Sequence, residues 1–531
     1  MGYPRIWAEK DPHKPAVIMA GVGSHPWPAG FTVTYAEIDE RSNRLARYFR
    51  SIGLGIGGHV AIFAENHPRY LETCWAAERS GLYFTAINSH LTADEVAYIV
   101  DDCGARVLVT SAAKLAVARA AIESCPNIER VLVFDEGLDA KTLDDKALDD
   151  RVMSYGATLS AFPATPVDDE TCGASMLYSS GTTGRPKGIV RPLSGASLAD
   201  NTATEATLQH FYAYDSSSIY LSPAPLYHAA PLGFNMTVLR LGGTTVVMEQ
   251  FDPRQFLGLI ADYGITHTQV VPTMFVRLLK LSRDEREAAD LSSLVSCVHA
   301  SAPCPVWAKE QMIEWWDPLG VAITEYYGGT ELNGLTFIYP DEWMRKRGSV
   351  GKSILGRIRI LDETGAELPA GQIGAVYFAD GGQFEYHNDS DKTASTFAPD
   401  GGGTTIGDIG FVDDEGYLFL TDRKAFMIIS GGVNIYPQEI EDVLIEHPHV
   451  ADVAVFGVPD DDMGEAVKAV VQLEADVSAS PAVEADLIEY CHAHLAHFKC
   501  PRSIDFEAEL PRLDTGKLYK RVLRDRYWSA V

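Results

Sequence analysis

Several marks of other protein classes are missing from this chain of 531 residues. Its eight cysteines include no Cys-x-x-Cys pair, so a zinc ribbon is excluded and reduced, buried thiols are expected. No apolar run reaches the roughly 18 residues of a membrane span. The first residues, Met-Gly-Tyr-Pro-Arg-Ile-Trp, contain no apolar signal core. We therefore expect a cytoplasmic protein without an integral membrane segment.

Positive charge is also scarce. Lys and Arg total 44 against 73 Asp and Glu, which gives a net charge of −29 at pH 7. Because such a surface repels phosphate backbones and anionic bilayers, nucleic acid is not expected as a partner. Hydrophobic residues make up 46% of the chain, as in packed globular proteins, and its length predicts more than one domain. A homodimer is left open as the assembly.

Short apolar runs alternate with helical patterns in the first part of the chain. Three runs are predicted to be buried strands: 59–64, 83–88 and 105–110. One helix is predicted to begin at Pro68 and to end near Gly81. A second helix follows the capping box of Thr92 and Glu95 and ends near Gly104. This alternation predicts an α/β fold with largely parallel strands.

A smaller unit is predicted at the C-terminal end. Its expected elements are a helix at 437–445, strands at 451–456 and 468–473, and a helix at 483–495. The apolar run 416–423 is predicted to be the last strand before this unit. We place the boundary after Asp422, which gives domains of residues 1–422 and 423–531.

The most informative segment is a strand-like run from Ala174 that leads into a loop of glycines, hydroxyl side chains and one lysine. Glycines allow close approach of an anion, hydroxyls donate hydrogen bonds and the lysine adds charge. The residues expected to hold phosphate are Ser179, Ser180, Gly181, Thr182, Thr183, Gly184 and Lys187. The loop is not a Walker A motif, because Pro186 stands where the second glycine would be.

This loop and several other motifs resemble, in the same order, those of the adenylate-forming superfamily. The resemblance extends from Thr34–Ile38 to Thr515–Lys517. This superfamily includes acyl-CoA and aryl-CoA synthetases, luciferase and peptide-synthetase adenylation domains. The resemblance implies a large N-terminal domain of layered α/β subdomains and a small mobile α+β C-terminal domain. It also implies ATP, Mg²⁺ and coenzyme A as reactants and cofactors, with an acyl-AMP intermediate.

The resemblance places further residues at the nucleotide. They are Ser301, Ala302, Pro303, Glu325, Tyr326, Tyr327, Gly328, Thr330, Asp408, Arg423 and Lys517. By this match Thr330 contacts the α-phosphate and is catalytic, and Glu331 holds Mg²⁺, which favours carboxylate oxygen. The segment 301–303 and Tyr327 enclose the adenine. Asp408 accepts both ribose hydroxyls, and Arg423 also reaches the ribose.

Another motif places His228 beside the substrate carboxylate as a catalytic gate. The alternative is that His228 is a histidine of the hydrophobic core. A role as general base is disfavoured, because a substrate carboxylate needs no base to become nucleophilic. The motif has no Asp to pair with an α-ammonium group, which favours an acid without an α-amino group. The expected acyl pocket consists of His228, Phe234, Met236 and Tyr326. Tyr326 stands where many relatives carry a small residue, so we expect it to limit the pocket.

The C-terminal unit carries the remaining matches. Lys517 aligns with the family's catalytic lysine and is expected to bridge the substrate carboxylate and the α-phosphate. Gly431 and Gly432 are expected to line the channel for the CoA thiol arm. Ala425 departs from the Asp or Lys common at the hinge. Residues 518–531 are too few for a carrier-protein domain, which favours a free thiol acceptor.

These observations predict an AMP-forming acid–thiol ligase of fatty acid metabolism, an acyl-CoA synthetase. The favoured substrate is an aliphatic, branched or cyclic apolar acid. Two alternatives within the family are an aryl-CoA ligase of the 4-coumarate type and an acyl-AMP ligase that loads a carrier protein. A third, outside enzymes, is an inactive nucleotide-binding regulator.

Overall fold

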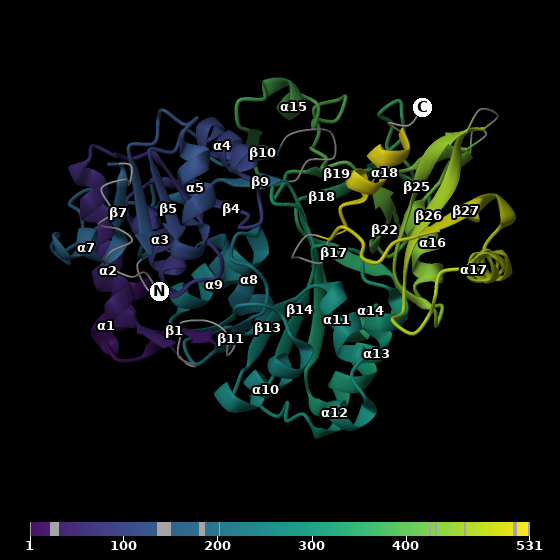
Figure 1. The fold of residues 1–531 in the computed structure, drawn as a ribbon, viewed down its shortest axis with the longest axis horizontal. Coiled ribbons are helices and arrows are strands. Elements are labelled where there is room, and N and C mark those ends of the chain that lie inside the picture. Colours follow the sequence, from purple (N-terminus) through teal and green to yellow (C-terminus); the bar gives the residue numbers. More distant parts are fainter. Residues whose placement is uncertain are drawn as a thin grey trace.

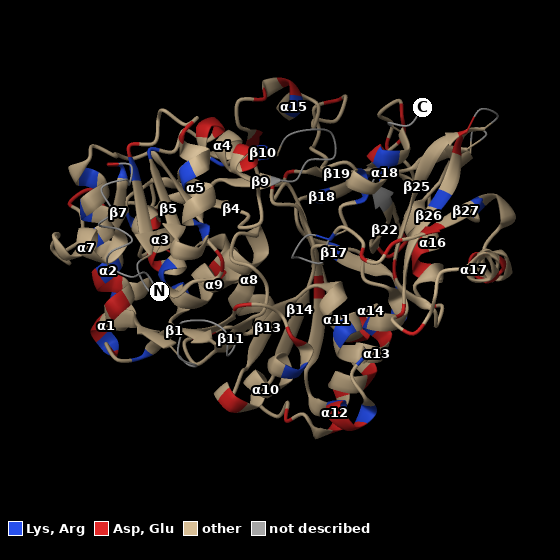
Figure 2. Ribbon diagram, viewed as in Figure 1, with Lys and Arg blue, Asp and Glu red and all other residues tan. Residues whose placement is uncertain are grey.

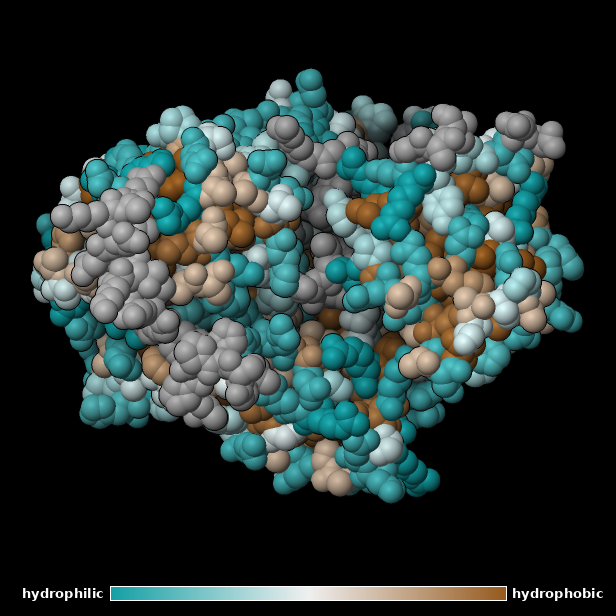
Figure 3. Space-filling view, in the orientation of Figure 1, coloured by the Kyte–Doolittle hydropathy of each residue, from teal (hydrophilic) through white to brown (hydrophobic). Residues whose placement is uncertain are grey.

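The computed structural model describes residues 2–21, 31–134, 150–179, 186–200, 202–423, 426–430, 433–460, 463–512 and 518–528. The N-terminal lobe lies on the left of Figure 1, and the C-terminal unit on the right. Charged residues of both signs are spread over the helices (Figure 2). Hydrophilic residues cover most of the face shown in Figure 3, with apolar residues in scattered groups. Within the described ranges, no helix is long and apolar enough to cross a membrane.

The N-terminal lobe contains a six-stranded sheet in which all neighbouring strands are parallel. Its order is β7 (Val152–Ser154), β6 (Arg130–Phe134), β5 (Val107–Ser111), β3 (His59–Phe63), β4 (Tyr83–Ile87) and β8 (Ala174–Ser175). The helices of this lobe are α2 (Tyr35–Ser51), α3 (Pro68–Arg79), α4 (Ala93–Asp102), α5 (Leu115–Ile122) and α7 (Tyr155–Ser160). The predicted strands and helices are confirmed. The Glu95 carboxylate accepts the Thr92 backbone N–H at 2.9 Å, as the capping box requires.

A sheet of 13 strands forms the centre of the molecule. Its order is β18 (Arg357–Leu361), β19 (Gly374–Ala379), β21 (Asp408–Val412), β22 (Leu418–Arg423), β17 (Ser349–Leu355), β16 (Leu335–Ile338), β15 (Ala322–Tyr327), β14 (Ser296–His299), β13 (His267–Val270), β11 (Ile219–Ser222), β12 (Thr244–Met248), β1 (Pro15–Ala20) and β2 (Phe31–Thr34). The run from β15 to β1 is parallel, and the remaining pairs are antiparallel.

Helices accompany this central sheet. They are α1 (Pro4–Lys10), α8 (Ala203–Tyr212), α9 (Ala229–Leu241), α10 (Pro253–Tyr263), α11 (Pro272–Leu279), α12 (Arg283–Ala288), α13 (Val306–Trp316) and α14 (Pro340–Arg345). Local sequence explains their starts: α10, for example, has Pro253 in its first turn, and the Asp252 carboxylate accepts the backbone N–H of Gln255 at 2.8 Å. Short 3₁₀ helices occur at Ala112–Lys114, Asp317–Leu319 and His497–Lys499.

A small three-stranded sheet connects the phosphate-loop region to a later part of the chain. It consists of β20 (Glu385–Tyr386), β10 (Lys187–Val190) and β9 (Leu177–Ser179), and α15 (Ser390–Ala394) follows β20. Figure 1 shows β9 and β10 beside the N-terminal lobe, with α15 above them.

The C-terminal unit has its own sheet and core. The strands are β24 (Val433–Ile435), β23 (Ile428–Ser430), β26 (Gly464–Leu473), β25 (Val450–Asp460) and β27 (Ser503–Phe506), and the helices are α16 (Pro437–Leu444), α17 (Pro481–His494) and α18 (Lys520–Trp528). The predicted elements are confirmed, although β25 and β26 are longer than expected because they pair as a hairpin. The chain is thus α/β, with a large N-terminal domain and a separate C-terminal domain. The boundary after Asp422 stays a prediction.

Candidate active site

The strand order of the central sheet gathers motifs that are far apart in the sequence. β11, β13, β14 and β15 are neighbouring parallel strands, so their carboxyl ends share one edge. His228 lies after β11, the segment 301–303 follows β14, and the segment 328–331 follows β15. These predicted site residues therefore follow strands that end at one edge of the sheet.

Tyr327 and Asp408, which are predicted to lie at the nucleoside, contact each other directly. The Tyr327 hydroxyl donates to Asp408 Oδ2 at 2.5 Å, although the two residues belong to different strands. Asp408 is 6% exposed and lies opposite Arg423 in the β21–β22 pair. The side chain of Arg423 is outside the described part. A flat ring beside a carboxylate can stack on a base while the carboxylate accepts ribose hydroxyls.

The turn after β14 carries the other predicted adenine contacts. Ser301 has a φ of 79°, in the left-handed region, and both Ser301 and Pro303 are exposed while Ala302 is half-buried. A left-handed residue reverses the chain sharply as it leaves the strand. The turn is therefore available to a ligand at this edge, as the resemblance implies.

Glu331 is a buried carboxylate beside the glycine-rich turn. Its Oε1 accepts the Tyr386 hydroxyl at 2.8 Å, and the residue is 7% exposed. A Cβ atom on Gly329 would lie 2.5 Å from Glu331 Oε2, so a larger residue there would displace this carboxylate. Among the described residues, no Lys or Arg forms an ion pair with Glu331. A carboxylate that is not paired with a cationic side chain fits a hard cation such as Mg²⁺. Gly328 and Thr330 are half-buried beside it.

Lys187 is the described member of the predicted phosphate loop. It begins β10, opposite Ser179 of β9, and its ammonium forms an ion pair with Asp389. The hydrogen bond that the Lys187 ammonium donates to Asp389 raises the pKa of Lys187, which keeps the ammonium charged. The side chain of Ser179 and the residues Ser180, Gly181, Thr182, Thr183 and Gly184 lie outside the described residues.

Glu325 differs from the other predicted nucleotide residues because its side chain is paired inside the protein. Its carboxylate forms an ion pair with Lys309 of α13, and His299 Nε2 lies 3.5 Å away. Lys309 and His299 are fully buried. Burial raises the pKa of Glu325 and lowers that of Lys309, while their mutual attraction opposes both shifts. Burial and the charge of Lys309 keep the pKa of His299 well below its usual range, so His299 is neutral.

The predicted acyl-pocket residues divide into two groups. The rings of Phe234 and Tyr326 lie 6.4 Å apart and nearly parallel, and Phe234 also packs against Tyr220. Met236 is two residues further along α9 and packs against a different core cluster. His228 precedes α9, with its ring 4.4 Å from that of Tyr227. The structure therefore brings Tyr326 and Phe234 together but places Met236 apart from them.

Lys517, Gly431, Gly432 and the hinge residue Ala425 lie outside the described residues.

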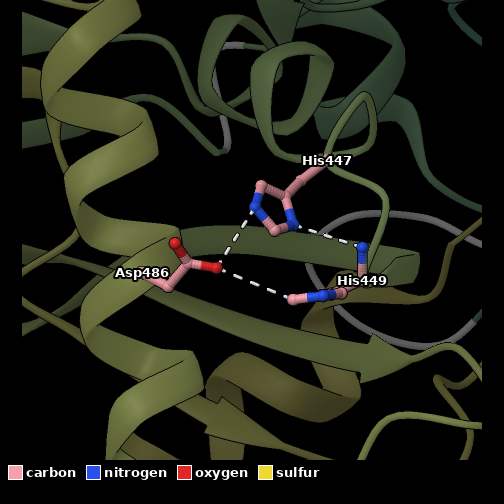
Figure 4. Close-up of side chains that lie close together, drawn as sticks. All are labelled: His447, His449 and Asp486. Carbon is pink, nitrogen blue, oxygen red and sulfur yellow. Dashed lines mark hydrogen bonds and ion pairs between the residues drawn. The ribbon is translucent and has the colours of Figure 1, made fainter.

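Another group of potential metal ligands, not predicted from the sequence, lies in the C-terminal domain (Figure 4). His447 Nε2 and His449 Nδ1 lie 3.4 and 3.6 Å from Asp486 Oδ2. However, His447 Nδ1 accepts the backbone N–H of His449 at 3.2 Å. A neutral His447 must then carry its proton on Nε2, where it faces the carboxylate. This arrangement suits hydrogen bonding better than metal ligation through Nε2.

Sequence reasoning missed the residues that contact the predicted ones: Lys309, His299, Tyr386 and Asp389. Asp389, for example, is 202 positions from its partner Lys187. No local pattern relates residues at such separations, so only the packing of strands could identify them. The eight cysteines are all free thiols; seven are buried and Cys304 is half-buried.

Comparisons with known proteins identify the family of this chain. The family model for AMP-binding enzymes matches residues 5–385, and that for the AMP-binding enzyme C-terminal domain matches residues 439–517. A fatty acid–[acyl-carrier-protein] ligase, ScoC of Streptomyces coeruleorubidus, is 32% identical and covers 98% of this chain and 95% of its own. Feruloyl-CoA synthase of Amycolatopsis is 33% identical, and the long-chain-fatty-acid–CoA ligase FadD13 of Mycobacterium tuberculosis is 30% identical; each alignment covers 94% of both chains.

A solved structure extends the similarity to three dimensions. ATP-bound MatB from Rhodopseudomonas palustris is 30% identical, with 99% of both chains covered and a TM-score of 0.79. The match thus includes both domains of the fold. The chain therefore belongs to the adenylate-forming family of AMP-binding enzymes and is an AMP-forming acid–thiol ligase of the acyl-CoA synthetase type.

Proposed function

We propose that this enzyme joins coenzyme A to a compact apolar acid, aliphatic, branched or cyclic, at the expense of ATP. The observation that carries the proposal is the 2.5 Å contact of Tyr327 with Asp408, which sets a stacking surface beside an acceptor for ribose hydroxyls. Thr330 and Lys187 serve the phosphates. Glu331 is the residue that would hold Mg²⁺, and the bound cation neutralises phosphate charge.

The reaction has two steps. A substrate carboxylate oxygen attacks the α-phosphorus of ATP, the bond to pyrophosphate breaks, and acyl-AMP forms. The thiolate of coenzyme A then attacks the acyl carbon, and AMP leaves. We assign Lys517 to charge stabilisation in the first step and the Gly431–Gly432 loop to the thiol channel in the second. Residues 423–531 form the domain that presents each in turn.

The substrate preference rests on the aromatic packing beside the carboxylate site. Tyr326 stacks on Phe234, and that ring is itself 6% exposed and packed on Tyr220, so the space behind Tyr326 is filled. This favours a compact acid over a long unbranched chain. The fatty-acid relatives support an aliphatic substrate, whereas the feruloyl-CoA relative supports an aryl acid as the second candidate.

The test is ATP–pyrophosphate exchange with a panel of short, branched, cyclic, aryl and long-chain acids. We expect exchange with compact apolar acids, followed by thioester formation when CoA is added. Exchange without CoA thioester, but with loading of a carrier protein, would favour the activity named for ScoC. Absence of exchange with every compact apolar acid would contradict the proposed substrate class.

A substitution at Tyr326 tests the pocket itself. Tyr326→Gly should shift the ranking of acids toward bulkier ones, because it opens the space that the phenol ring fills. Tyr326→Phe keeps the ring and is the matched control, with the wild-type ranking expected. An unchanged ranking in Tyr326→Gly would show that Tyr326 belongs to the core rather than to the pocket.

A further inference from the structure

Residues 386–389, here called the latch segment, lie against the strand that carries Lys187. Tyr386 pairs with Ile189 in the β20–β10 ladder, and the backbone N–H of His387 donates to the Gly188 carbonyl at 2.7 Å. Asn388 has a φ of 55°, a left-handed conformation that asparagine tolerates. Its amide donates to the Asp102 carboxylate at the end of α4 at 3.3 Å. The latch segment is therefore held by strand β10 and by the end of α4.

The side chains at the two ends of the latch segment contact two groups assigned above to ATP and Mg²⁺. At one end, the Tyr386 hydroxyl donates to Glu331 Oε1 at 2.8 Å, and both residues are 7% exposed. At the other, the Asp389 carboxylate forms an ion pair with Lys187. Glu331 follows β15 of the central sheet, whereas Lys187 begins β10 of the small sheet. The latch segment thus links two separate elements of the nucleotide site.

We propose that Tyr386 and Asp389 are positioning residues for adenylation: Tyr386 orients Glu331 for the cation, and Asp389 is the counter-ion that ATP phosphate displaces from Lys187. This inference rests on the proposed roles of Lys187 and Glu331. A phenol restrains the carboxylate without neutralising it, which leaves the negative charge for a cation. A carboxylate competes with phosphate for the same ammonium group, so ATP binding exchanges one anion for another.

The counter-ion role is tested with Asp389→Asn. Asparagine can still cap α15, where Asp389 Oδ1 accepts the Lys392 backbone N–H at 2.9 Å, but it no longer competes for Lys187. Partly exposed ion pairs contribute little, so KM for ATP and the inhibition constant of pyrophosphate should fall about two- to fivefold. Asp391→Asn removes an equal charge from exposed Asp391 in the same helix and should leave both constants unchanged. Equal constants in the two variants would overturn this role.

The orienting role is tested with Tyr386→Phe, which removes only the hydroxyl. The Mg²⁺ concentration for half-maximal exchange should rise about tenfold, because loss of a group that orients a metal ligand commonly has an effect of this size. KM for the acid should stay unchanged. Tyr417→Phe is the matched control, since the Tyr417 hydroxyl donates to Glu342 at 2.9 Å elsewhere in the fold. The same Mg²⁺ dependence in both variants would overturn the role of Tyr386.

Two further variants separate this inference from the proposed function. Lys187→Ala should raise KM for ATP, and Glu331→Gln should raise the Mg²⁺ requirement. If neither does, the assigned roles of Lys187 and Glu331 are wrong and the inference falls with them. If both do, but Asp389→Asn and Tyr386→Phe match their controls, only the inference is wrong.

Discussion

Three buried carboxylates around the proposed nucleotide site differ in the partner that each contacts. Asp408 and Glu331 accept hydrogen bonds from the phenols of Tyr327 and Tyr386, whereas Glu325 is paired with the ammonium of Lys309. A phenol leaves the negative charge available to a ligand, and an ammonium group neutralises it. This difference favours Asp408 and Glu331 as binding groups and gives Glu325 a structural role as well.

For Asp408, the prediction concerns ATP affinity. Asp408→Ala removes the acceptor for both ribose hydroxyls, and charge-assisted hydrogen bonds contribute about 1.5–3 kcal/mol each. KM for ATP in pyrophosphate exchange should rise at least about tenfold, while KM for the acid changes little. Tyr327→Phe keeps the ring and should have a smaller effect. A KM for ATP within about twofold of wild type would contradict the ribose assignment.

For Lys309, the prediction concerns stability. Lys309→Met leaves the Glu325 carboxylate buried without its ion-pair partner, which should cost about 3–5 kcal/mol of unfolding free energy. Addition of Glu325→Gln should recover much of this loss. Unfolding by denaturant can be followed by tryptophan fluorescence. The ring of Trp343 lies 4.8 Å from the Lys309 ammonium and therefore reports on this site. Lys499→Met breaks a partly exposed pair with Glu439 and should cost less than about 1 kcal/mol.

Among the elements, strand β13 contributes a histidine that packs against the aromatic residues around Phe234. His267, its first residue, stacks on Tyr214 with ring centroids 4.1 Å apart. Its Nε2 lies 2.9 Å from the carbonyl oxygen of Tyr212, so this nitrogen donates and carries the proton. Burial lowers the pKa of His267 to about 4. The neutral ring therefore holds together the residues that pack around Phe234.

This histidine makes stability depend on pH. The folded pKa of about 4 lies below the unfolded value of about 6.5, so the unfolded chain binds the proton first as pH falls. The stabilisation of the fold by neutral His267 is fully present above about pH 6.5 and is lost as the pH falls toward 4. Between about pH 7 and pH 5, wild type should lose about 2 kcal/mol more than His267→Gln, which cannot titrate. Parallel stability curves for the two proteins would contradict the neutral assignment.

Over the whole molecule, contact between the two domains includes a weak ion pair. Lys280 Nζ lies 2.7 Å from Glu474 Oε1, and both side chains are at least one-third exposed. Exposed pairs of this kind contribute roughly 0–1 kcal/mol. Such a contact can break at little cost if residues 423–531 rotate between the two half-reactions.

The rotation predicts a separation of the two steps in Lys517→Ala. Loss of one preorganised charge should slow adenylation by about 10²–10³-fold, because the role proposed for this lysine is to stabilise charge as pyrophosphate departs. The same variant, given synthetic acyl-AMP and CoA, should form thioester at a near-normal rate. Stopped-flow or quenched assays of each half-reaction provide the measurement. Equal loss in both steps would show that Lys517 supports the structure of the domain instead.

Local patterns were enough to predict the α/β class, the strands near residues 59–110 and the elements of the C-terminal domain. A capping box such as Thr92 with Glu95 acts within one helical turn, and buried strands are continuous apolar runs, so both can be recognised in short windows. The ordered motifs were likewise enough to indicate the adenylate-forming family, because each consists of neighbouring residues.

Tertiary structure alone decided which partners these residues have. Lys187 contacts Asp389 and Glu325 contacts Lys309 because separate strands and helices pack together, and their sequence positions carry no sign of it. Packing also separates two residues of α9. Phe234 points toward Tyr326, whereas Met236, two positions later on the helix, packs against a different core cluster. Sequence motifs therefore determined the kind of chemistry, whereas packing determined which charges are neutralised and which remain for ligands, because electrostatic interactions depend on distance in space.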